Sequence, residues 1–380
     1  MRRLLLGVLL IGAVGRAPLT SVGPLVSDIR ADLGLSSAAA GLLTTLPLLA
    51  FAVFSLVAPL VAGRAGLERS LGIALLLLAG GIAVRSLPAQ LWIGTVAVGA
   101  AIACFNVLLP SVVKRDFPDR VAPVTGGYSA TQSVVAAVAS GTAVPLAAAL
   151  AGWRWALASW ALLVVVALVV WAPSVRSAEP GASGAARAPL PWRSVLAWQV
   201  TLFMGTQSLA FYVLITWLPT IERDHGIAPA VAGWHLFGYL AAAVAANLIV
   251  PLFMRARSDQ RLVGLGCAAC IGAGLAGLQW LPWNPWWALA AVLVAGFGAG
   301  MAIVVCLSLF SLRTTDARQA AALSAMAQST GYLLAAGGPV LVGALRDAAG
   351  SWTVPVVVLC GLTAAMALFA WLSGRARTVA

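Results

Sequence analysis

Charged residues are scarce in this sequence of 380 residues. Asp, Glu, Lys and Arg make up 9% of the chain, against about 25% of an ordinary soluble protein. Apolar residues make up 62%, and so few charges could not cover that much apolar surface in water. The composition excludes a soluble enzyme, a disordered chain and a secreted disulfide scaffold. It indicates an all-α protein that crosses a membrane many times.

The sequence also lacks the motifs of several kinds of chemistry. It contains no GxxxxGK[ST] phosphate loop, no His and Glu metal cluster and no evident Ser/His/Asp set. Cys267 and Cys270 have the spacing of a metal or redox pair. They lie among Ala and Gly, so we interpret them as small buried hydrophobic residues. We therefore expect no enzyme activity, no cofactor and no metal ion.

Twelve apolar runs are long enough to span a membrane as helices of about 20 residues. These runs are 4–26, 38–62, 70–87, 90–112, 121–150, 154–172, 196–219, 229–254, 262–281, 285–311, 319–345 and 352–372. The stretch 173–193 is polar and rich in Gly, Pro and Ala, which is typical of a flexible linker. The predicted domains are an N-terminal six-helix bundle (1–172), a cytoplasmic linker (173–193) and a C-terminal six-helix bundle (194–380).

The net charge of +12 follows the pattern of a topology signal. Basic residues stand in short groups between apolar runs, and not in one cluster that could bind nucleic acid. With Met1 inside, seventeen of the 23 Lys and Arg residues fall in cytoplasmic segments and five outside. The positive-inside rule therefore places both termini in the cytoplasm. Because Arg16 interrupts the first run and no A-x-A site follows, we interpret that run as a span and not as a signal peptide.

The two halves align with each other at an offset of 192 over residues 29–80. Gly34 then meets Gly226, and Arg69 meets Arg261. Two parallel six-helix repeats joined by a cytoplasmic linker describe the major facilitator fold. In that fold the substrate lies near the midplane between the halves, and rocking of the halves alternates access to it.

Arg16 is the unusual charge. It lies about twelve residues into the first run, roughly 18 Å along a helix, where a charge costs about 2.5–3.5 kcal/mol on insertion scales. One interpretation is structural: Gly15 and Pro18 loosen the helix and expose carbonyls that neutralise the guanidinium. The other is functional: a fixed positive charge faces a wet cavity and draws in an anionic or electron-rich substrate.

Further polar and aromatic residues lie at a similar depth on helices that line the cavity in this fold. Each Gln taken alone has an alternative role in hydrogen bonding between helices. With Arg16, the candidate substrate-binding residues are Asn106, Gln132, Gln207, Phe211, Tyr212, Gln328 and Tyr332.

Three residues are candidates for gating or coupling. Trp217 could close an aromatic gate with Phe211 and Tyr212, or anchor its helix at the interface. Arg85 ends the third helix, where it could snorkel to the interface or guide substrate inward. His235 could couple transport to protons, or be a structural histidine. No span is predicted to hold Asp or Glu, the usual residues of proton symport.

Four segments carry a family resemblance. GRAPLTSVGPLVSDI resembles the first-helix signature of the cyanate/2-nitroimidazole permease family (CynX/NimT) of the major facilitator superfamily, with Ala17 between an Arg and a Pro that are usually adjacent. The other segments are similar to the fourth, seventh, and tenth to eleventh helices of that family: NVLLPSVVKRDFPDR (106–120), QSLAFYVLITWLP (207–219) and residues 308–347.

The resemblance implies a secondary or facilitative transporter of small anions such as cyanate, or of small nitroheterocycles. We expect alternating access in the inner membrane of a bacterium, by uniport, by exchange or with a proton that moves with the substrate. The expected partners are the small-molecule substrate and membrane lipid, without nucleic acid, and the expected state is a monomer. The alternative within transport is efflux of larger, drug-like molecules. A membrane-embedded enzyme or receptor is the alternative from another class.

Overall fold

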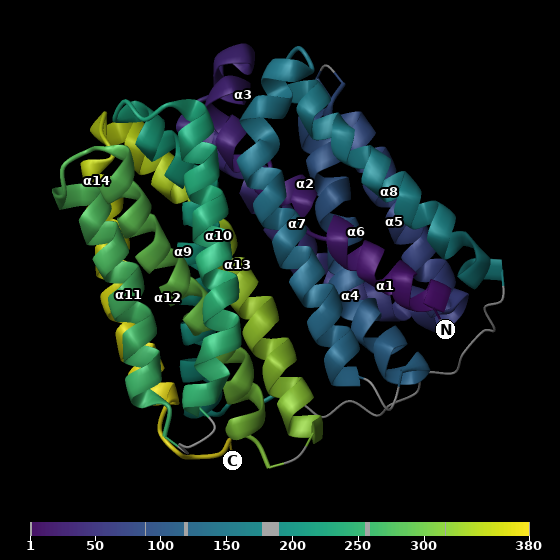
Figure 1. Ribbon diagram of the computed structural model, residues 1–380. Coiled ribbons are helices and arrows are strands. Elements are labelled where there is room, and N and C mark those ends of the chain that lie inside the picture. The colour runs from purple at the N-terminus through teal and green to yellow at the C-terminus, as the bar shows by residue number, and fades with distance from the viewer. Residues whose placement is uncertain are drawn as a thin grey trace. The chain divides into compact units, whose positions relative to one another are not determined.

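The computed structural model describes residues 2–87, 89–117, 121–176, 190–254, 259–315 and 317–379. Within these ranges every regular element is a helix and no strand occurs (Figure 1). Most of the predicted linker, 177–189, lies outside the described residues. Its first residues, 173–176, belong to the preceding helix, because apolar Val and Trp residues carry the helix to Arg176.

The first predicted span is divided into four pieces, and the others are single helices. The pieces are α1 (Arg2–Val14), α2 (Ala17–Thr20), the 3₁₀ turn η1 (Gly23–Leu25) and α3 (Val26–Leu33). The single helices are α4 (Ser37–Ala65), α5 (Leu67–Arg85), α6 (Leu91–Asp116), α7 (Val121–Ala149), α8 (Trp153–Arg176), α9 (Val195–Asp224), α10 (Pro229–Met254), α11 (Arg261–Trp280), α12 (Pro285–Leu312), α13 (Ala317–Ala349) and α14 (Thr353–Ser373).

Eleven segments in the described part of the chain are long and apolar enough to cross a membrane, counting Arg3–Leu33 as one. The helix α13 is not among them, because its 33 residues carry many polar side chains. The seventh predicted span ended at Pro219, but α9 continues to Asp224. An internal proline removes one backbone hydrogen bond, and the buried residues Ile221 and Glu222 extend the helix beyond it.

By packing, the chain forms two units. Unit 1 holds Met1–Ile29 and Leu46–Gly184, and unit 2 holds Arg30–Thr45 and Ala185–Ala380. In unit 1, α5 packs against α6 and α8, and α1 packs against α7 and α8. In unit 2, α9 is central and contacts α10, α12, α13 and α14. The first part of α4 therefore packs within unit 2 and the rest within unit 1.

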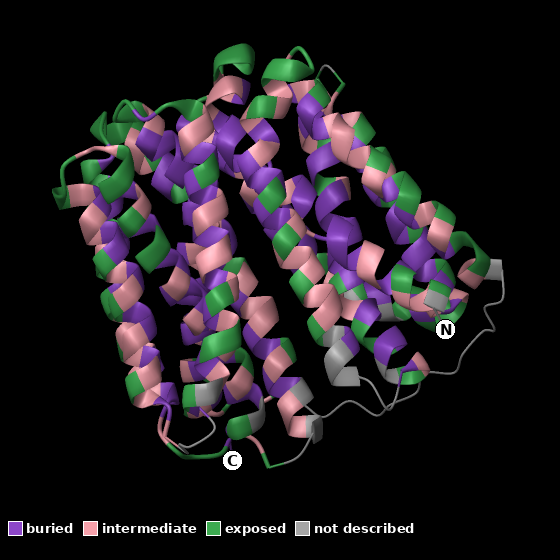
Figure 2. Cartoon of the chain, viewed as in Figure 1, coloured by how far each residue is buried: buried purple, intermediate pink, exposed green. Residues whose placement is uncertain are grey.

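Exposed residues recur along the helices (Figure 2), and many of them are large and apolar. Leu76 on α5, Leu162 on α8, Leu248 on α10 and Leu341 on α13 are all more than 60% exposed. Apolar surface of this extent suits lipid and not water. The chain is a multi-pass membrane protein.

Local geometry agrees with the internal repeat. Gly34 follows α3 with φ +63°, and its predicted counterpart Gly226 follows α9 with φ +89°. This left-handed conformation is unfavourable for residues with a Cβ. Glycine thus ends a helix in the same way at matched positions of the repeat.

Candidate functional site

The first span is broken at Arg16. The helix α1 ends at Val14 and α2 begins at Ala17, with Arg16 in a non-helical conformation between them (φ −137°, ψ −29°). Pro18 accounts for the position of the break. A proline has no N–H for the carbonyl four residues earlier and its ring clashes with that carbonyl, which here belongs to Val14. The predicted loosening of the helix at this point is confirmed.

The Arg16 side chain is half-buried, and its charge is not neutralised locally. Within the described ranges, no hydrogen bond or ion pair involves its guanidinium. The Arg16 carbonyl accepts the amides of Leu19 and Thr20 instead. The structural interpretation of Arg16 required backbone carbonyls to satisfy its guanidinium. No carbonyl of the described residues does so.

The helix α7 lies against the break. The Thr20 hydroxyl donates to the Ala136 carbonyl at 2.9 Å and ties α2 to α7. A Cβ on Gly15 would come within 2.8 Å of Gln132 Nε2, so glycine leaves the space that this amide occupies. The structure thus brings Gln132 to the Arg16 break.

Arg85 also contacts the break. Its side chain is 1% exposed, and Nη1 donates to the Pro18 carbonyl at 2.7 Å. This carbonyl is available because the Val22 amide bonds to Leu19 and not to Pro18. Of the two alternatives for Arg85, snorkelling to the interface is contradicted, since an unsatisfied backbone acceptor draws the guanidinium inward.

Asn106 is the remaining candidate in unit 1. It lies on α6 with an exposed side chain. In the described part of the chain, no hydrogen bond or ring contact joins it to Arg16 or Gln132, so its place in the site rests on its predicted depth alone.

In unit 2 the predicted aromatic residues form one cluster. The ring centroids of Tyr212 on α9 and Tyr332 on α13 are 6.3 Å apart, in an edge-to-face arrangement. Phe211 contacts Tyr212 at 5.3 Å and Tyr239 at 6.0 Å. Tyr239, on α10, was missed by sequence reasoning. It lies four residues after His235 and therefore on the same helix face, a spacing that could have identified it.

The two glutamines of unit 2 bond within their own helices. Gln207 is buried, and its Nε2 donates to Ser208 Oγ at 2.7 Å and approaches the Met204 sulfur at 3.3 Å. The half-buried Gln328 donates to Ser324 Oγ at 2.8 Å, one turn earlier on α13. Each glutamine thus commits an amide N–H group within its own helix.

Trp217 is part of the core of unit 2. Its side chain is fully buried, Nε1 donates to the Pro339 carbonyl on α13 at 2.9 Å, and its ring lies 5.5 Å from that of Trp352. Of the two alternatives for Trp217, interfacial anchoring is contradicted, because α13 and the chain before α14 cover the indole.

His235 has a buried acidic partner. Its Nδ1 lies 2.9 Å from Oε1 of Glu222, and the two side chains are 6% and 0% exposed. The expectation that no span holds a carboxylate is wrong: α9 extends one turn further than predicted and includes Glu222. The helical spacing of the apolar residues Leu218 and Ile221 before Glu222 was the available signal.

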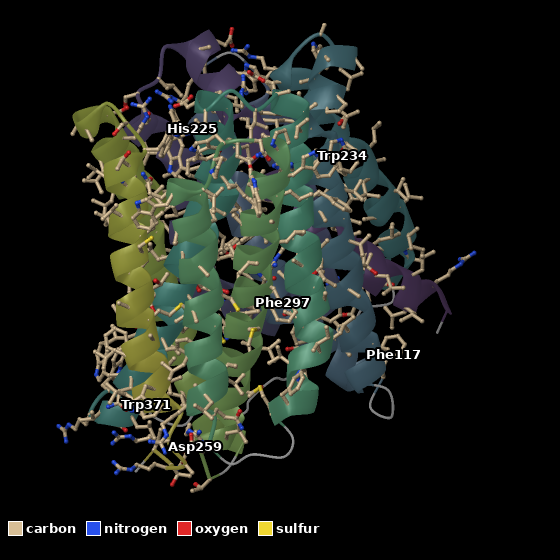
Figure 3. The ribbon with its side chains drawn as sticks, turned by 60° about the vertical axis from the view of Figure 1, so that its left-hand side comes forward. Phe117, His225, Trp234, Asp259, Phe297 and Trp371 are labelled. Carbon is tan, nitrogen blue, oxygen red and sulfur yellow. The ribbon has the colours of Figure 1, made fainter. Side chains whose placement is uncertain are left out.

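Charged residues lie at both ends of unit 2. Asp259 pairs with Arg261, which stacks on Trp371 at 4.6 Å, and this cluster lies at the end opposite His225 (Figure 3). Hydrogen bonds from Arg261 hold the pKa of Asp259 below its usual value. At the other end, Asp224 accepts from Arg346 and from the Trp352 indole. These groups stabilise helix ends.

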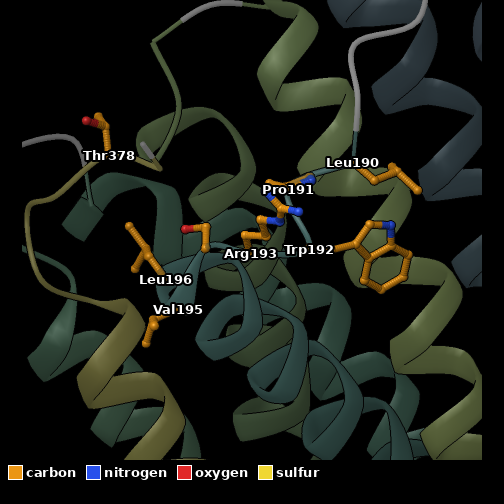
Figure 4. Close-up of a pocket in the computed structure, with 8 residues that line it drawn as sticks. Leu190, Pro191, Trp192, Arg193, Val195, Leu196 and Thr378 are labelled. Carbon is orange, nitrogen blue, oxygen red and sulfur yellow. The ribbon is translucent and has the colours of Figure 1, made fainter.

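A hollow of about 580 Å³ precedes α9, lined by Leu190, Pro191, Trp192, Arg193, Ser194, Val195, Leu196 and Thr378 (Figure 4). None of the predicted site residues lines it. It therefore stays separate from the candidate site.

Known proteins resemble the chain over its full length. The sequence family described as Major Facilitator Superfamily matches residues 5–339 and 200–379. A 2-nitroimidazole transporter of Escherichia coli is 46% identical, with 99% of this chain and 96% of that protein aligned. The cyanate transport protein CynX of the same organism is 30% identical, over 94% and 95%.

Solved structures show the same fold. The crystal structure of a bacterial homologue of the human lysosomal transporter Spinster superposes with a TM-score of 0.83, at 16% identity, and covers 98% of this chain and 96% of that one. The structure of the nucleoside transporter NupG gives a TM-score of 0.82 at 11% identity, over 98% and 100%.

Proposed function

Because this chain belongs to the CynX/NimT family of the major facilitator superfamily, we propose that it carries a small anionic or electron-rich compound across the bacterial inner membrane, with Arg16 as its anchor. The chain is a small-molecule transporter and not an enzyme. Transport by alternating access, as in this fold generally, is part of the proposal, as are the monomeric state and contact with lipid.

The state of Arg16 is the observation that carries the proposal. A charge at membrane depth is costly, so such residues pair with other groups or face a water-filled cavity. The described residues leave the Arg16 guanidinium without a partner. Its planar donors fit acceptor atoms in pairs. Gln132, beside the break, adds an amide for hydrogen bonding.

The names of the relatives suggest the substrate class. Cyanate is a small anion, and 2-nitroimidazole is a small ring with electron-rich nitro oxygens. Both present acceptors that a guanidinium can bind. The edge-to-face pair of Tyr212 and Tyr332, with Phe211 beside it, supports contact with a flat ring. Asn106, Gln207 and Gln328 complete the proposed set as hydrogen-bonding side chains.

Counterflow in proteoliposomes tests the proposal. Vesicles loaded with unlabelled cyanate or 2-nitroimidazole should take up the labelled compound through the wild-type protein. Arg16→Ala should abolish this uptake and Arg16→Lys should leave part of it, because a single ammonium keeps the charge but loses the paired donors. Arg154→Ala removes the same charge at the start of α8 and serves as the control. Equal uptake by wild type and Arg16→Ala would overturn the role of Arg16.

The second candidate, efflux of larger drug-like molecules, is favoured by the aromatic cluster of unit 2. Such substrates depend on ring contacts and not on a single charge. Transport of bulky aromatic cations that is unchanged in Arg16→Ala, without transport of cyanate or 2-nitroimidazole, would establish it.

A further inference from the structure

We propose that Glu222 and His235 form a binding site for the proton that drives accumulation of the substrate. The inference rests on the proposed transport function, but the site itself is defined by its own geometry. The carboxylate on α9 and the imidazole on α10 meet at 2.9 Å, and both are buried in unit 2.

The site has one open hydrogen-bonding position. Glu222 Oε1 faces His235 Nδ1, whereas Glu222 Oε2 is buried with no hydrogen bond among the described residues. A buried carboxylate oxygen without a partner is costly. A proton bound at Oε2 removes the negative charge responsible for most of that cost.

The pair can hold zero, one or two protons beyond the bare carboxylate and neutral imidazole. With none, the pair carries one negative charge. With one, as carboxylate and imidazolium or as carboxylic acid and imidazole, it is neutral. With two it carries one positive charge. Apolar surroundings penalise net charge, so the neutral one-proton state is the stable, proton-loaded form of the pair. Loss of that proton leaves a buried negative charge, which favours any conformation in which Glu222 is exposed to water.

Few other charges surround the pair. Besides His235, α10 carries one other titratable side chain, the phenol of Tyr239, and it has no Asp, Glu, Lys or Arg. The helices α12 and α14 carry no Asp, Glu, His, Lys or Arg. Arg223 and Asp224 follow Glu222 on α9, and His225 comes directly after the helix. On α13, Arg346 pairs with Asp224, and Asp347 accepts amides of α4. Unit 2 also includes residues 30–45, and this segment carries Arg30 and Asp32.

The matched controls lie within three residues of Glu222. Asp224 is an exposed carboxylate on the same helix, and His225 is an exposed imidazole stacked on Trp283 at 3.8 Å. Asp224→Asn and His225→Gln remove the same functional groups at the same end of unit 2. They should leave proton-driven transport in place, because neither side chain is buried in the pair.

Infrared titration of the purified full-length protein in lipid nanodiscs tests the site without any substrate. A protonated carboxylic acid has a carbonyl band that its carboxylate lacks. We expect a band that titrates in the wild type, disappears in Glu222→Gln, shifts its midpoint in His235→Gln and persists in Asp224→Asn. A titration curve that is identical in wild type and Glu222→Gln would overturn the proposal.

Transport by the same variants in proteoliposomes separates coupling from binding. A pH gradient should make the wild type accumulate substrate, whereas Glu222→Gln should only equalise the concentrations while its counterflow stays within about twofold of the wild type. Accumulation by Glu222→Gln equal to that of wild type would also overturn the proposal. Absence of all substrate counterflow in the wild type would instead refute the proposed function, and the infrared titration would still decide the proton site.

Discussion

The Arg85 guanidinium and the Pro18 carbonyl oxygen, 2.7 Å apart, tie the end of α5 to the break in the first span. Arg85 Nε and Nη2 have no hydrogen bond among the described residues, so the side chain pays a desolvation cost for one backbone contact. We expect this contact to hold Pro18, and with it the nearby Arg16, in position.

Replacement of Arg85 by methionine should separate stability from binding. Met fills a similar volume without the buried charge, so the free energy of unfolding should stay within about 1 kcal/mol or rise. Substrate affinity should fall about tenfold, or about 1.4 kcal/mol, because the break loses a support. Thermal unfolding and calorimetry measure the two effects. Loss of stability without loss of affinity would make Arg85 purely structural.

Pro18→Ala should straighten the first span. Alanine supplies the amide that Pro18 lacks, so a helical hydrogen bond to Val14 can form. We expect a higher melting temperature and at least about tenfold weaker binding, because Arg16 then rotates with a continuous helix. Pro251→Ala, inside α10, is the control. Unchanged affinity in Pro18→Ala would show that the break does not position Arg16.

The pair of Tyr212 and Tyr332 should distinguish flat rings from small anions. Tyr212→Ala should weaken binding of 2-nitroimidazole by about 0.5–1.5 kcal/mol, the range for aromatic pairs, and leave cyanate binding unchanged. Tyr212→Phe keeps the ring and should retain the affinity. Equal losses for both ligands in calorimetry would contradict a ring contact.

Asp347 should make stability depend on pH. It accepts amide hydrogen bonds from Ser37 at 3.1 Å and Ala38 at 3.0 Å, at the start of α4 within unit 2. Burial acts to raise the pKa of Asp347, but the hydrogen bonds from Ala38 and Ser37 outweigh it and hold the pKa below its usual value.

A carboxyl whose pKa is lowered by folding stabilises the protein above its unfolded pKa, and loses that effect as pH falls through its folded pKa. Wild type should therefore melt at a higher temperature than Asp347→Asn near neutral pH. The difference should shrink as the solution is acidified to about pH 3. A melting-temperature difference that does not vary with pH would refute this account of Asp347.

Much of the fold followed from composition and spacing. Apolar runs bounded by charges predicted the spans, because a helix satisfies all backbone hydrogen bonds within one segment, as lipid requires. Gly34 and Gly226 were matched by the repeat alone, and both adopt the left-handed conformation. The effect of Pro18 on the first span was likewise readable, since its steric cause is local.

The predictions from sequence failed where contacts between distant segments determine a helix end or the direction of a side chain. The predicted seventh span ended at Pro219, so Glu222 was placed outside it. The buried face of α9 in fact continues through Ile221 and Glu222. For Arg85 and Trp217, candidates for gating or coupling, an interfacial role was the alternative because both lie close to predicted helix ends. Both turn inward to backbone carbonyls, of Pro18 and Pro339, and no local pattern reveals those distant acceptors.

The most direct test of the central claim is calorimetric titration of cyanate and 2-nitroimidazole into purified wild type, Arg16→Ala and the control Arg154→Ala. An anchoring Arg16 predicts measurable binding to wild type and to Arg154→Ala, and a loss of at least about tenfold in Arg16→Ala. Equal affinities in wild type and Arg16→Ala would contradict the account and leave Arg16 with a structural role only.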